Sequence, residues 1–222
     1  MPPKTIPVWL PYFAPFIVFL LLTTLESKFT AVYPALYTVK ILLTGGLLFY
    51  FRRCYPEARP SEGKNIWLGA VLGVALVVLW VSVDKHTPHF AFLGGRIGYN
   101  PWVQISSALA RAAFLSVRFL GLAIVVPFME ELLYRSFLLR FVTDMDNFQR
   151  VPVGTFSLIA LLINVGMFSL SHPEWLAAAI FGLTMCLLVA RTKSLFACVV
   201  AHGTTNLLLG VYVCYSHQWQ YW

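Results

Sequence analysis

Apolar stretches long enough to cross a lipid bilayer follow one another along nearly the whole chain. A transmembrane helix needs about 20 predominantly apolar residues. Stretches of roughly this length occupy residues 8–25, 33–51, 66–83, 119–142, 155–171, 175–190 and 195–215. Residues 84–101 are polar and contain two adjacent glycines, so we expect a loop there. The pattern predicts an all-α, polytopic transmembrane helix bundle of about seven spans, within a range of six to eight.

The low content of charged residues excludes an ordinary soluble domain. Only 11% of the 222 residues are charged and 59% are hydrophobic, whereas a soluble domain carries about 25% charged residues. Lipid must therefore be the solvent for most of the chain. Because the chain is too short for a membrane bundle plus a separate soluble domain, we expect a single integral membrane domain over residues 1–222. The first apolar stretch lacks a small-residue cleavage site before Glu26, which favours a first span over a removed signal peptide.

Basic residues cluster in the short connections between the apolar stretches, where they set orientation in the membrane. With a cytoplasmic N-terminus, the inside connections would hold Lys4, Arg52, Arg53, Arg59, Lys64, Arg140, Arg150, Arg191 and Lys193. The outside connections would hold only Lys28, Lys85 and Arg96. This asymmetry predicts that the N-terminus is cytoplasmic. The net charge of +7 does not indicate a nucleic-acid partner, because no basic patch is interleaved with exposed aromatic residues.

Cysteine spacing and the one HxxH pattern give no sign of a disulfide framework or a zinc finger. The cysteines are Cys54, Cys186, Cys198 and Cys214; none forms a CxxC pair, and three lie in apolar stretches. We expect them to pack as small buried hydrophobes. His86 and His89 lie in a proline-containing loop with no third ligand nearby, so we interpret this HxxH as a solvated loop.

Glu130, Glu131 and Arg135 interrupt the middle of the apolar stretch 119–142. An ionisable side chain inside the bilayer costs about 2.5–3.5 kcal/mol on insertion scales and usually has a function. Glu131 and Arg135 are four residues apart and are expected to pair along one helical face. Glu130 lies about 100° further round the helix, near the middle of the bilayer. A spare carboxylate at this depth favours a functional role over a purely structural one.

A second polar pair lies in the last apolar stretch. His202 and Asn206 are four residues apart and therefore share one helical face. His202 is nine residues from Lys193, which places it about 14 Å deep at 1.5 Å per residue, a depth similar to that of Glu130. The amide on the same face argues against an isolated histidine bonded to a carbonyl.

The depth of His172 conflicts with a site shared with Glu130. His172 ends the apolar stretch 155–171 and precedes Pro173, which is typical of a junction between helices. If the helix is straight, the rise per residue places His172 nearly 25 Å from the inner connection, which is too far from Glu130. An elbow near Gly154, or a tilted or short helix, would remove the conflict.

Three motifs occur in order on these hydrophobic segments: EExxxR, FxxxH and HxxxN. They comprise Glu130, Glu131 and Arg135, then Phe168 and His172, then His202 and Asn206. The set resembles the CPBP family of CAAX proteases and bacteriocin-processing enzymes, also called the Abi family, whose eukaryotic members are type II CAAX prenyl endopeptidases. The resemblance covers residues 119–208, which we treat as a motif-bearing catalytic core. The family often has glycine after the motif arginine, where this chain has Ser136; we expect this to affect helix packing rather than chemistry.

The resemblance implies an all-helical membrane protease that cleaves a membrane-embedded or lipid-anchored protein or peptide. It implies that Glu130, His172, His202 and Asn206 are the catalytic residues and that Glu131 and Arg135 support them. Residues 33–56 are similar to a bacterial branch that is called CAAX-protease-related and associated with exosortase systems. We therefore expect an integral protein of the bacterial inner (cytoplasmic) membrane.

The residue types allow two mechanisms of peptide hydrolysis. In the first, Glu130 is the general base for a water molecule, His172 helps to orient that water, and His202 with Asn206 stabilises the oxyanion. In the second, Glu130, His172 and His202 bind a zinc ion with an open position. The chain has no HExxH motif and asparagine is a poor zinc ligand, so we favour the site without a metal or other cofactor.

A non-catalytic membrane protein is the alternative function. An immunity factor, scaffold or small transporter could keep the polar cluster for helix association, which polar groups favour by about 0.6 kcal/mol on average.

Four other polar positions have local interpretations. Lys40 either snorkels to the interface or lines a cavity. Arg111 and Arg118 share one face of an amphipathic helix over residues 102–118, which lies at the surface or extends the next span. Asn164 is expected to bond a neighbouring helix, and Glu174 to lie at a helix start where the dipole favours a negative charge.

Overall fold

The computed structural model describes residues 6–60 and 62–222, and all the secondary structure in this part of the chain is helical. The first half contains α1 (Leu10–Lys28), α2 (Tyr33–Tyr50), α3 (Gly63–Asp84), a short α4 (Pro101–Gln104) and α5 (Ala108–Leu120). The second half contains α6 (Val126–Glu131), α7 (Leu139–Thr143), α8 (Leu158–Leu170), α9 (Trp175–Thr192) and α10 (Leu195–Ser216). The prediction of an all-α polytopic bundle is confirmed.

Six helices within the described residues are long and apolar enough to cross a membrane. They are Leu10–Lys28, Thr30–Tyr50, Gly63–Asp84, Ala108–Thr143, Trp175–Thr192 and Leu195–Ser216. The fifth predicted span is the exception, because α8 has only 13 residues and a full crossing needs about 20. The structure thus has six long spans and one short apolar helix, within the range of six to eight.

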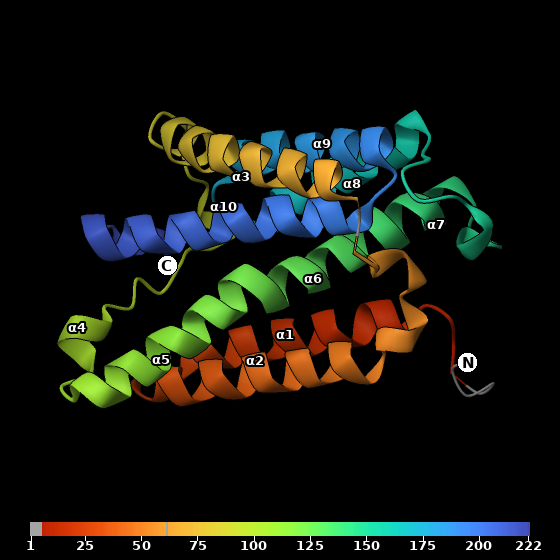
Figure 1. Cartoon of the computed structure of the whole chain (residues 1–222). Coiled ribbons are helices and arrows are strands. Elements are labelled where there is room, and N and C mark those ends of the chain that lie inside the picture. The colour runs from red at the N-terminus through yellow and green to blue at the C-terminus, as the bar shows by residue number, and fades with distance from the viewer. Residues whose placement is uncertain (1–5, 61) are drawn as a thin grey trace.

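The helix that carries Glu130 is much longer than the expected stretch 119–142. It runs without a break through α5, α6 and α7, from Ala108 to Thr143, over 36 residues. At 1.5 Å per residue it is about 54 Å long, so it crosses the molecule on a diagonal (Figure 1). Residues 108–118 therefore extend the span instead of lying separately at the surface, whereas residues 105–107 are not helical and interrupt the helix predicted over residues 102–118. Two π-helical turns, Gly121–Val125 and Leu132–Leu138, flank α6.

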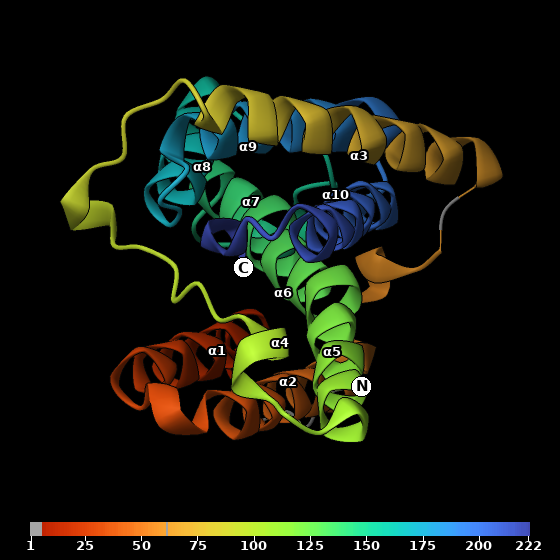
Figure 2. The same cartoon turned by 90° about the vertical axis from the view of Figure 1, so that its left-hand side faces the viewer.

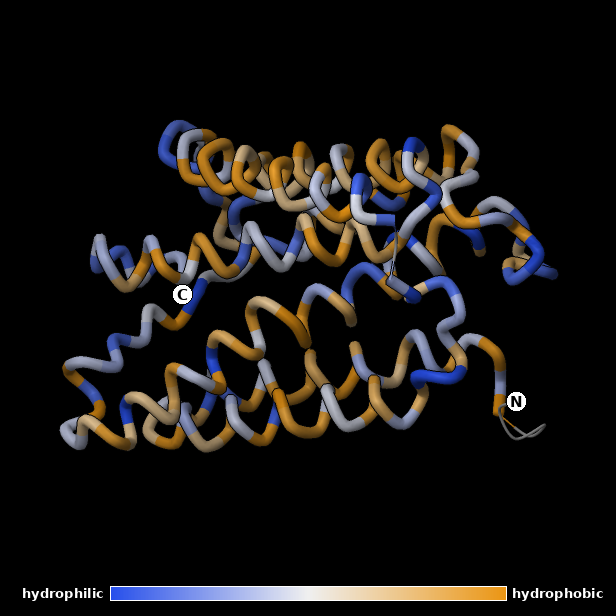
Figure 3. Tube along the Cα trace, in the orientation of Figure 1, coloured by the Kyte–Doolittle hydropathy of each residue, from blue (hydrophilic) through white to orange (hydrophobic). Residues whose placement is uncertain are grey.

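The helices form two groups, with this diagonal helix and α10 between them. α1 and α2 pack side by side on one side of the molecule, and α3, α8 and α9 lie together on the other (Figures 1 and 2). Apolar residues dominate the helices, whereas hydrophilic residues gather mainly in the connections (Figure 3). This distribution suits helices in lipid with connections in the water phases. Cys186 and Cys198 are fully buried, as expected of small hydrophobes, while Cys54 and Cys214 are half-buried.

Two glycines allow α3 to lie directly against α10. Gly69 and Gly73 are one helical turn apart, and a methyl group added at Gly69 would lie 2.5 Å from the carbonyl oxygen of Ala197. The Thr205 hydroxyl donates a hydrogen bond of 3.0 Å to the Gly73 carbonyl across the same contact. Small residues give membrane helices this close approach, and dispersion between the helices replaces the hydrophobic effect as the driving force.

We predict that Gly69→Ala destabilises the protein, because the new methyl group must push α3 away from the α10 backbone. Overpacking of this kind costs about 1–3 kcal/mol. Gly46→Ala in α2 is the matched control, since nothing lies within 4 Å of its added methyl group. Thermal unfolding of both variants in one detergent measures the difference. Equal melting temperatures for the two variants would show that the α3–α10 contact is not tight.

Candidate active site

A cavity of about 400 Å³ lies among the helices, and residues of all three motifs line it. Glu130 comes from α6, His172 from the junction after α8, and His202 with Asn206 from α10. Each residue that the sequence proposed as catalytic therefore reaches one space.

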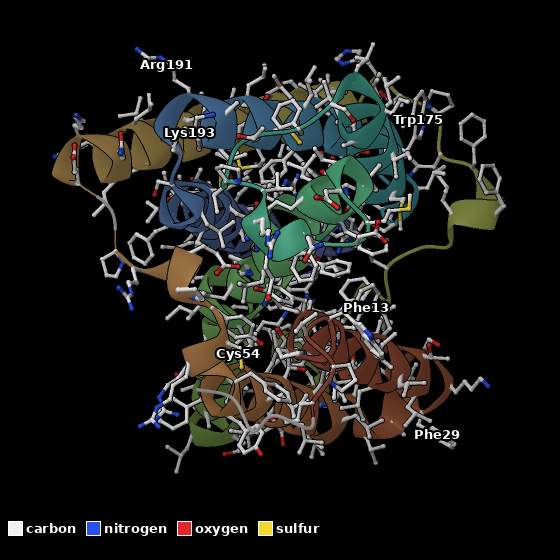
Figure 4. All side chains as sticks on the ribbon, turned by 90° about the vertical axis from the view of Figure 1, so that its right-hand side faces the viewer. Phe13, Phe29, Cys54, Trp175, Arg191 and Lys193 are labelled. Carbon is white, nitrogen blue, oxygen red and sulfur yellow. The ribbon has the colours of Figure 1, made fainter. Side chains whose placement is uncertain are left out.

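The conflict over the depth of His172 is resolved by the short α8. Gly154 has a left-handed φ of +77° and packs against the backbone of Val189, where a Cβ would not fit. The Lys193 ammonium also donates to the Gly154 carbonyl over 2.8 Å. This turn delays the start of α8 to Leu158. His172 then lies before Trp175, at the end of α9 away from Arg191 and Lys193 (Figure 4).

The Glu131 carboxylate joins two of the motifs. Glu131 is fully buried, and its Oε1 accepts hydrogen bonds from Nδ1 of His202 over 2.7 Å and from Nη1 of Arg135 over 3.3 Å. The predicted Glu131–Arg135 pair is confirmed, and His202 is an additional partner. Arg135 also donates to the Gly182 carbonyl over 3.4 Å and stacks on the Phe168 ring at 4.4 Å. One ion pair thus connects the diagonal helix to α8, α9 and α10.

Glu130 has no such partner. Its Oε2 is buried without a hydrogen bond to any residue that the structure describes. Nε2 of His202 lies 3.8 Å from Oε2, which is beyond hydrogen-bond length. Because Nδ1 of His202 donates to Glu131, Nε2 is the ring atom directed at Glu130. The arrangement leaves a carboxylate and an imidazole facing one another across a gap in the cavity.

The described residues form hydrogen bonds with Nδ1 of His172 but not with its Nε2 atom. Its Nδ1 lies 2.8 Å from the Phe168 carbonyl oxygen, and since a carbonyl only accepts, Nδ1 carries the proton. Burial lowers the pKa of His172 below its usual 6.5, although the negative charge of Glu130 acts in the opposite direction. The ring lies between Phe168 and Trp80, with centroids 4.6 and 5.8 Å away. His172 is therefore a neutral base at pH 7 with its lone pair on Nε2.

Asn206 lines the same cavity as His202, as their shared helical face predicted. Its side-chain amide donates one hydrogen bond of 3.1 Å to the Leu122 carbonyl, in the first π-helical turn. This bond fixes the amide plane and leaves the second N–H of the amide for another acceptor.

Two ion pairs at the cavity were not anticipated from the sequence. Arg96, in the loop after α3, holds the Glu174 carboxylate through two bonds of 2.7 and 2.9 Å. Burial raises the pKa of Glu174, but the Arg96 guanidinium more than offsets this and keeps it below the usual value. Lys40 lines the cavity and pairs with Glu26 at 2.5 Å. Of the two predictions for Lys40, snorkelling to the interface or lining a cavity, the second is confirmed. Arg96 and Glu174 are 78 residues apart in the sequence, and Lys40 and Glu26 are 14 apart. Each pair joins two different elements, so the helical period could not predict it.

Two local predictions about helix packing are also tested by the structure. The Asn164 amide donates to the Tyr134 carbonyl over 2.6 Å, so its bond to a neighbouring helix is confirmed. Ser136, where the CPBP motif often has glycine, bonds both Glu57 and Arg140. Its hydroxyl thus contributes to packing beneath the site and does not line the cavity.

The metal-binding alternative has suitable donor types but not the grouping it needs. Glu130 Oε2 and the Nε2 atoms of His172 and His202 are chemically suited to zinc. Within the part of the chain that the structure describes, however, no three His, Cys, Asp or Glu side chains lie close enough together to hold a metal ion.

The HxxH pattern in the loop after α3 has separate local partners. The Nδ1 atom of His86 bonds the Ser82 carbonyl over 2.8 Å, and the Nε2 atom of His89 bonds Asp84 over 2.7 Å. The side chain of His89 is about half exposed, in agreement with a solvated loop.

Residues 112–208 match the family model of type II CAAX prenyl endopeptidase Rce1-like proteins. This part of the chain is Rce1-like. The match confirms the resemblance to CAAX proteases that the three motifs indicated, and it covers somewhat less than half of the chain. No curated protein and no solved structure matches the chain significantly. Together with six apolar helices, the Rce1-like segment identifies an integral membrane protein.

We predict that Arg135→Met in the Rce1-like segment severely destabilises the protein. It leaves the buried Glu131 carboxylate without its permanent cation, which typically costs about 3–5 kcal/mol. Lys64→Met is the matched control, because the Lys64–Glu62 pair is exposed and such pairs contribute about 0–1 kcal/mol. Denaturant titration of both variants gives the comparison. A loss below about 1 kcal/mol for Arg135→Met would contradict a structural role for this pair.

Proposed function

We propose that this protein is an intramembrane endopeptidase that hydrolyses a peptide bond of a membrane-associated protein with a water molecule activated by Glu130. The observation that carries the proposal is the unbonded Glu130 carboxylate, buried in the cavity and facing Nε2 of His202 at 3.8 Å. A buried carboxylate without a partner is costly in a membrane unless it has a function. The Rce1-like segment supports protease activity of the CAAX type.

In the proposed reaction, Glu130 takes a proton from water as the water oxygen bonds to the scissile carbonyl carbon. His172 accepts a hydrogen bond from the same water through its free Nε2 and so orients it. The carbonyl oxygen becomes an oxyanion, which receives hydrogen bonds from the spare amide N–H of Asn206 and from Nε2 of His202 in its protonated form. Glu130 then gives its proton to the leaving nitrogen as the C–N bond breaks.

Glu131 and Arg135 support this arrangement without touching the substrate. Glu131 holds His202 so that Nε2 and not Nδ1 faces the cavity, and Arg135 holds Glu131. We propose that the substrate is membrane-embedded or lipid-anchored, since apolar helices surround the cavity. The basic connections favour a cytoplasmic N-terminus, and the resemblance of residues 33–56 to a bacterial branch favours a bacterial cytoplasmic membrane.

We predict that Glu130→Gln abolishes cleavage while the protein stays folded. General-base catalysis contributes about 10²–10⁴-fold, and an amide cannot take a proton from water. Purified protein in detergent or liposomes is incubated with hydrophobic and lipidated peptides, and mass spectrometry detects the products. Glu62→Gln, at an exposed carboxylate, is the control and retains full activity. Unchanged cleavage by Glu130→Gln would favour a non-catalytic role of the polar cluster, as in an immunity factor, scaffold or small transporter.

We further predict that cleavage survives phenanthroline, because a glutamate-activated water needs no metal. The rate is measured before chelation, after chelation, and after zinc is added back. Loss of activity that zinc restores would instead favour the alternative in which Glu130, His172 and His202 bind the ion.

A further inference from the structure

The indole N–H of Trp80 is a buried hydrogen-bond donor in the wall of the cavity. Trp80 lies in α3, is 6% exposed and lines the same cavity as Glu130 and His172. Its Nε1 atom forms no hydrogen bond with any residue that the structure describes. This N–H can only donate, and a buried tryptophan usually has an acceptor. An acceptor that enters the cavity would therefore stabilise the side chain where it lies.

Trp80 packs against the two motif histidines, one directly and one through a phenylalanine. Its ring meets the His172 ring edge to face, with centroids 5.8 Å apart, and meets the Phe181 ring in the same way at 5.9 Å. Phe181 in turn contacts the His202 ring, with centroids 4.9 Å apart. Trp222 also has an unbonded N–H in the cavity wall, but its ring packs on a guanidinium from α5 instead. Of the two indoles, Trp80 is thus the one beside the residues that would surround a reacting peptide bond.

The chemistry of a peptide indicates which acceptor Trp80 binds. A peptide that enters the cavity supplies one carbonyl oxygen per residue, and each is a strong acceptor. Consecutive Cα atoms are about 3.8 Å apart, so an indole in contact with His172 lies within about two residues of the bond that the water attacks. The scissile carbonyl itself receives hydrogen bonds from His202 and Asn206 in the proposed reaction. A neighbouring main-chain carbonyl is therefore the acceptor that fits Trp80.

We infer that the Trp80 N–H donates a hydrogen bond to a main-chain carbonyl of the substrate, within about two residues of the scissile bond. The inference rests on the proposed function, because Glu130 and His172 define where that bond lies. Trp80 lies outside the Rce1-like segment 112–208, so α3 adds a substrate-binding residue to the polar motifs of that segment. The hydrogen bond sets the register of the peptide and takes no part in the chemical step.

The test is a scan that starts from a hydrophobic peptide and places one thioamide at successive positions on both sides of the scissile bond. Sulfur accepts hydrogen bonds more weakly than oxygen, and one neutral hydrogen bond contributes enough to change kcat/KM by about 3- to 10-fold. With the wild-type protein, a thioamide at one position near the scissile bond should therefore reduce kcat/KM by this factor. Trp80→Phe should cleave the parent peptide more slowly by the same factor and show no further loss with that thioamide. A purely structural role would slow all the peptides alike, and equal thioamide effects in both proteins at every position overturn the inference.

Two further proteins separate the loss of a hydrogen bond from a change in packing. Benzothienylalanine in place of Trp80 has sulfur instead of the N–H in a ring of nearly the same shape, so it should reproduce the effect of Trp80→Phe. Trp67→Phe is the matched control, because Trp67 lies on the same helix but is 73% exposed. This control should keep the full response to the thioamide. A full response in the benzothienylalanine protein, or its loss in Trp67→Phe, contradicts a hydrogen bond specific to Trp80.

Binding to the Glu130→Gln protein distinguishes this inference from the proposed function. The parent peptide should bind this protein about 3- to 10-fold more tightly than one thioamide peptide of the scan, and adding Trp80→Phe should remove the difference. If this result is obtained but no form of the protein cleaves a peptide, only the proposed function fails. If cleavage depends on Glu130 but Trp80→Phe changes no thioamide effect, only the inference fails. A protein that binds none of the peptides contradicts both.

Discussion

The buried Glu131 carboxylate holds together the helices that carry the three polar motifs. Its Oε1 atom accepts from Arg135 on its own helix and from His202 on α10. Arg135 in turn donates to the Gly182 carbonyl of α9 and stacks on the Phe168 ring of α8. Breaking this link inside lipid would leave charges with neither water nor partner, so the connection is strongly favoured. The fixed position of Glu131 also fixes the direction of its neighbour Glu130, which faces the cavity.

The Rce1-like segment forms only part of the cavity. Residues 112–208 supply the three motifs and Arg118. The remaining wall comes from outside that segment: α1 and α2 contribute the Glu26–Lys40 pair and Tyr33, and the loop after α3 contributes Arg96. The N-terminal helices therefore line the cavity beside the polar cluster.

The helical period and the cost of charge in lipid predicted the parts of the site that lie on one helix. Glu131 with Arg135 and His202 with Asn206 are each four residues apart, and both pairs share a face as expected. The helical period could not predict which residues on different helices become partners. The Arg96–Glu174 pair and the bond from His202 to Glu131 depend on how the helices pack, and no sequence spacing specifies that packing. The depth predicted for His172 from a straight helix was wrong, because the turn at Gly154 shortens α8.

A bound peptide would show whether Glu130, His172 and His202 converge on one peptide bond. An experimental structure of the Glu130→Gln protein with an uncleaved hydrophobic peptide would show where the scissile carbonyl lies. We expect the carbonyl oxygen to lie within about 3.5 Å of His202 Nε2 or the Asn206 amide, with the carbonyl carbon next to residue 130. A peptide that binds elsewhere and leaves this cavity empty would show that these residues do not act together on a peptide bond.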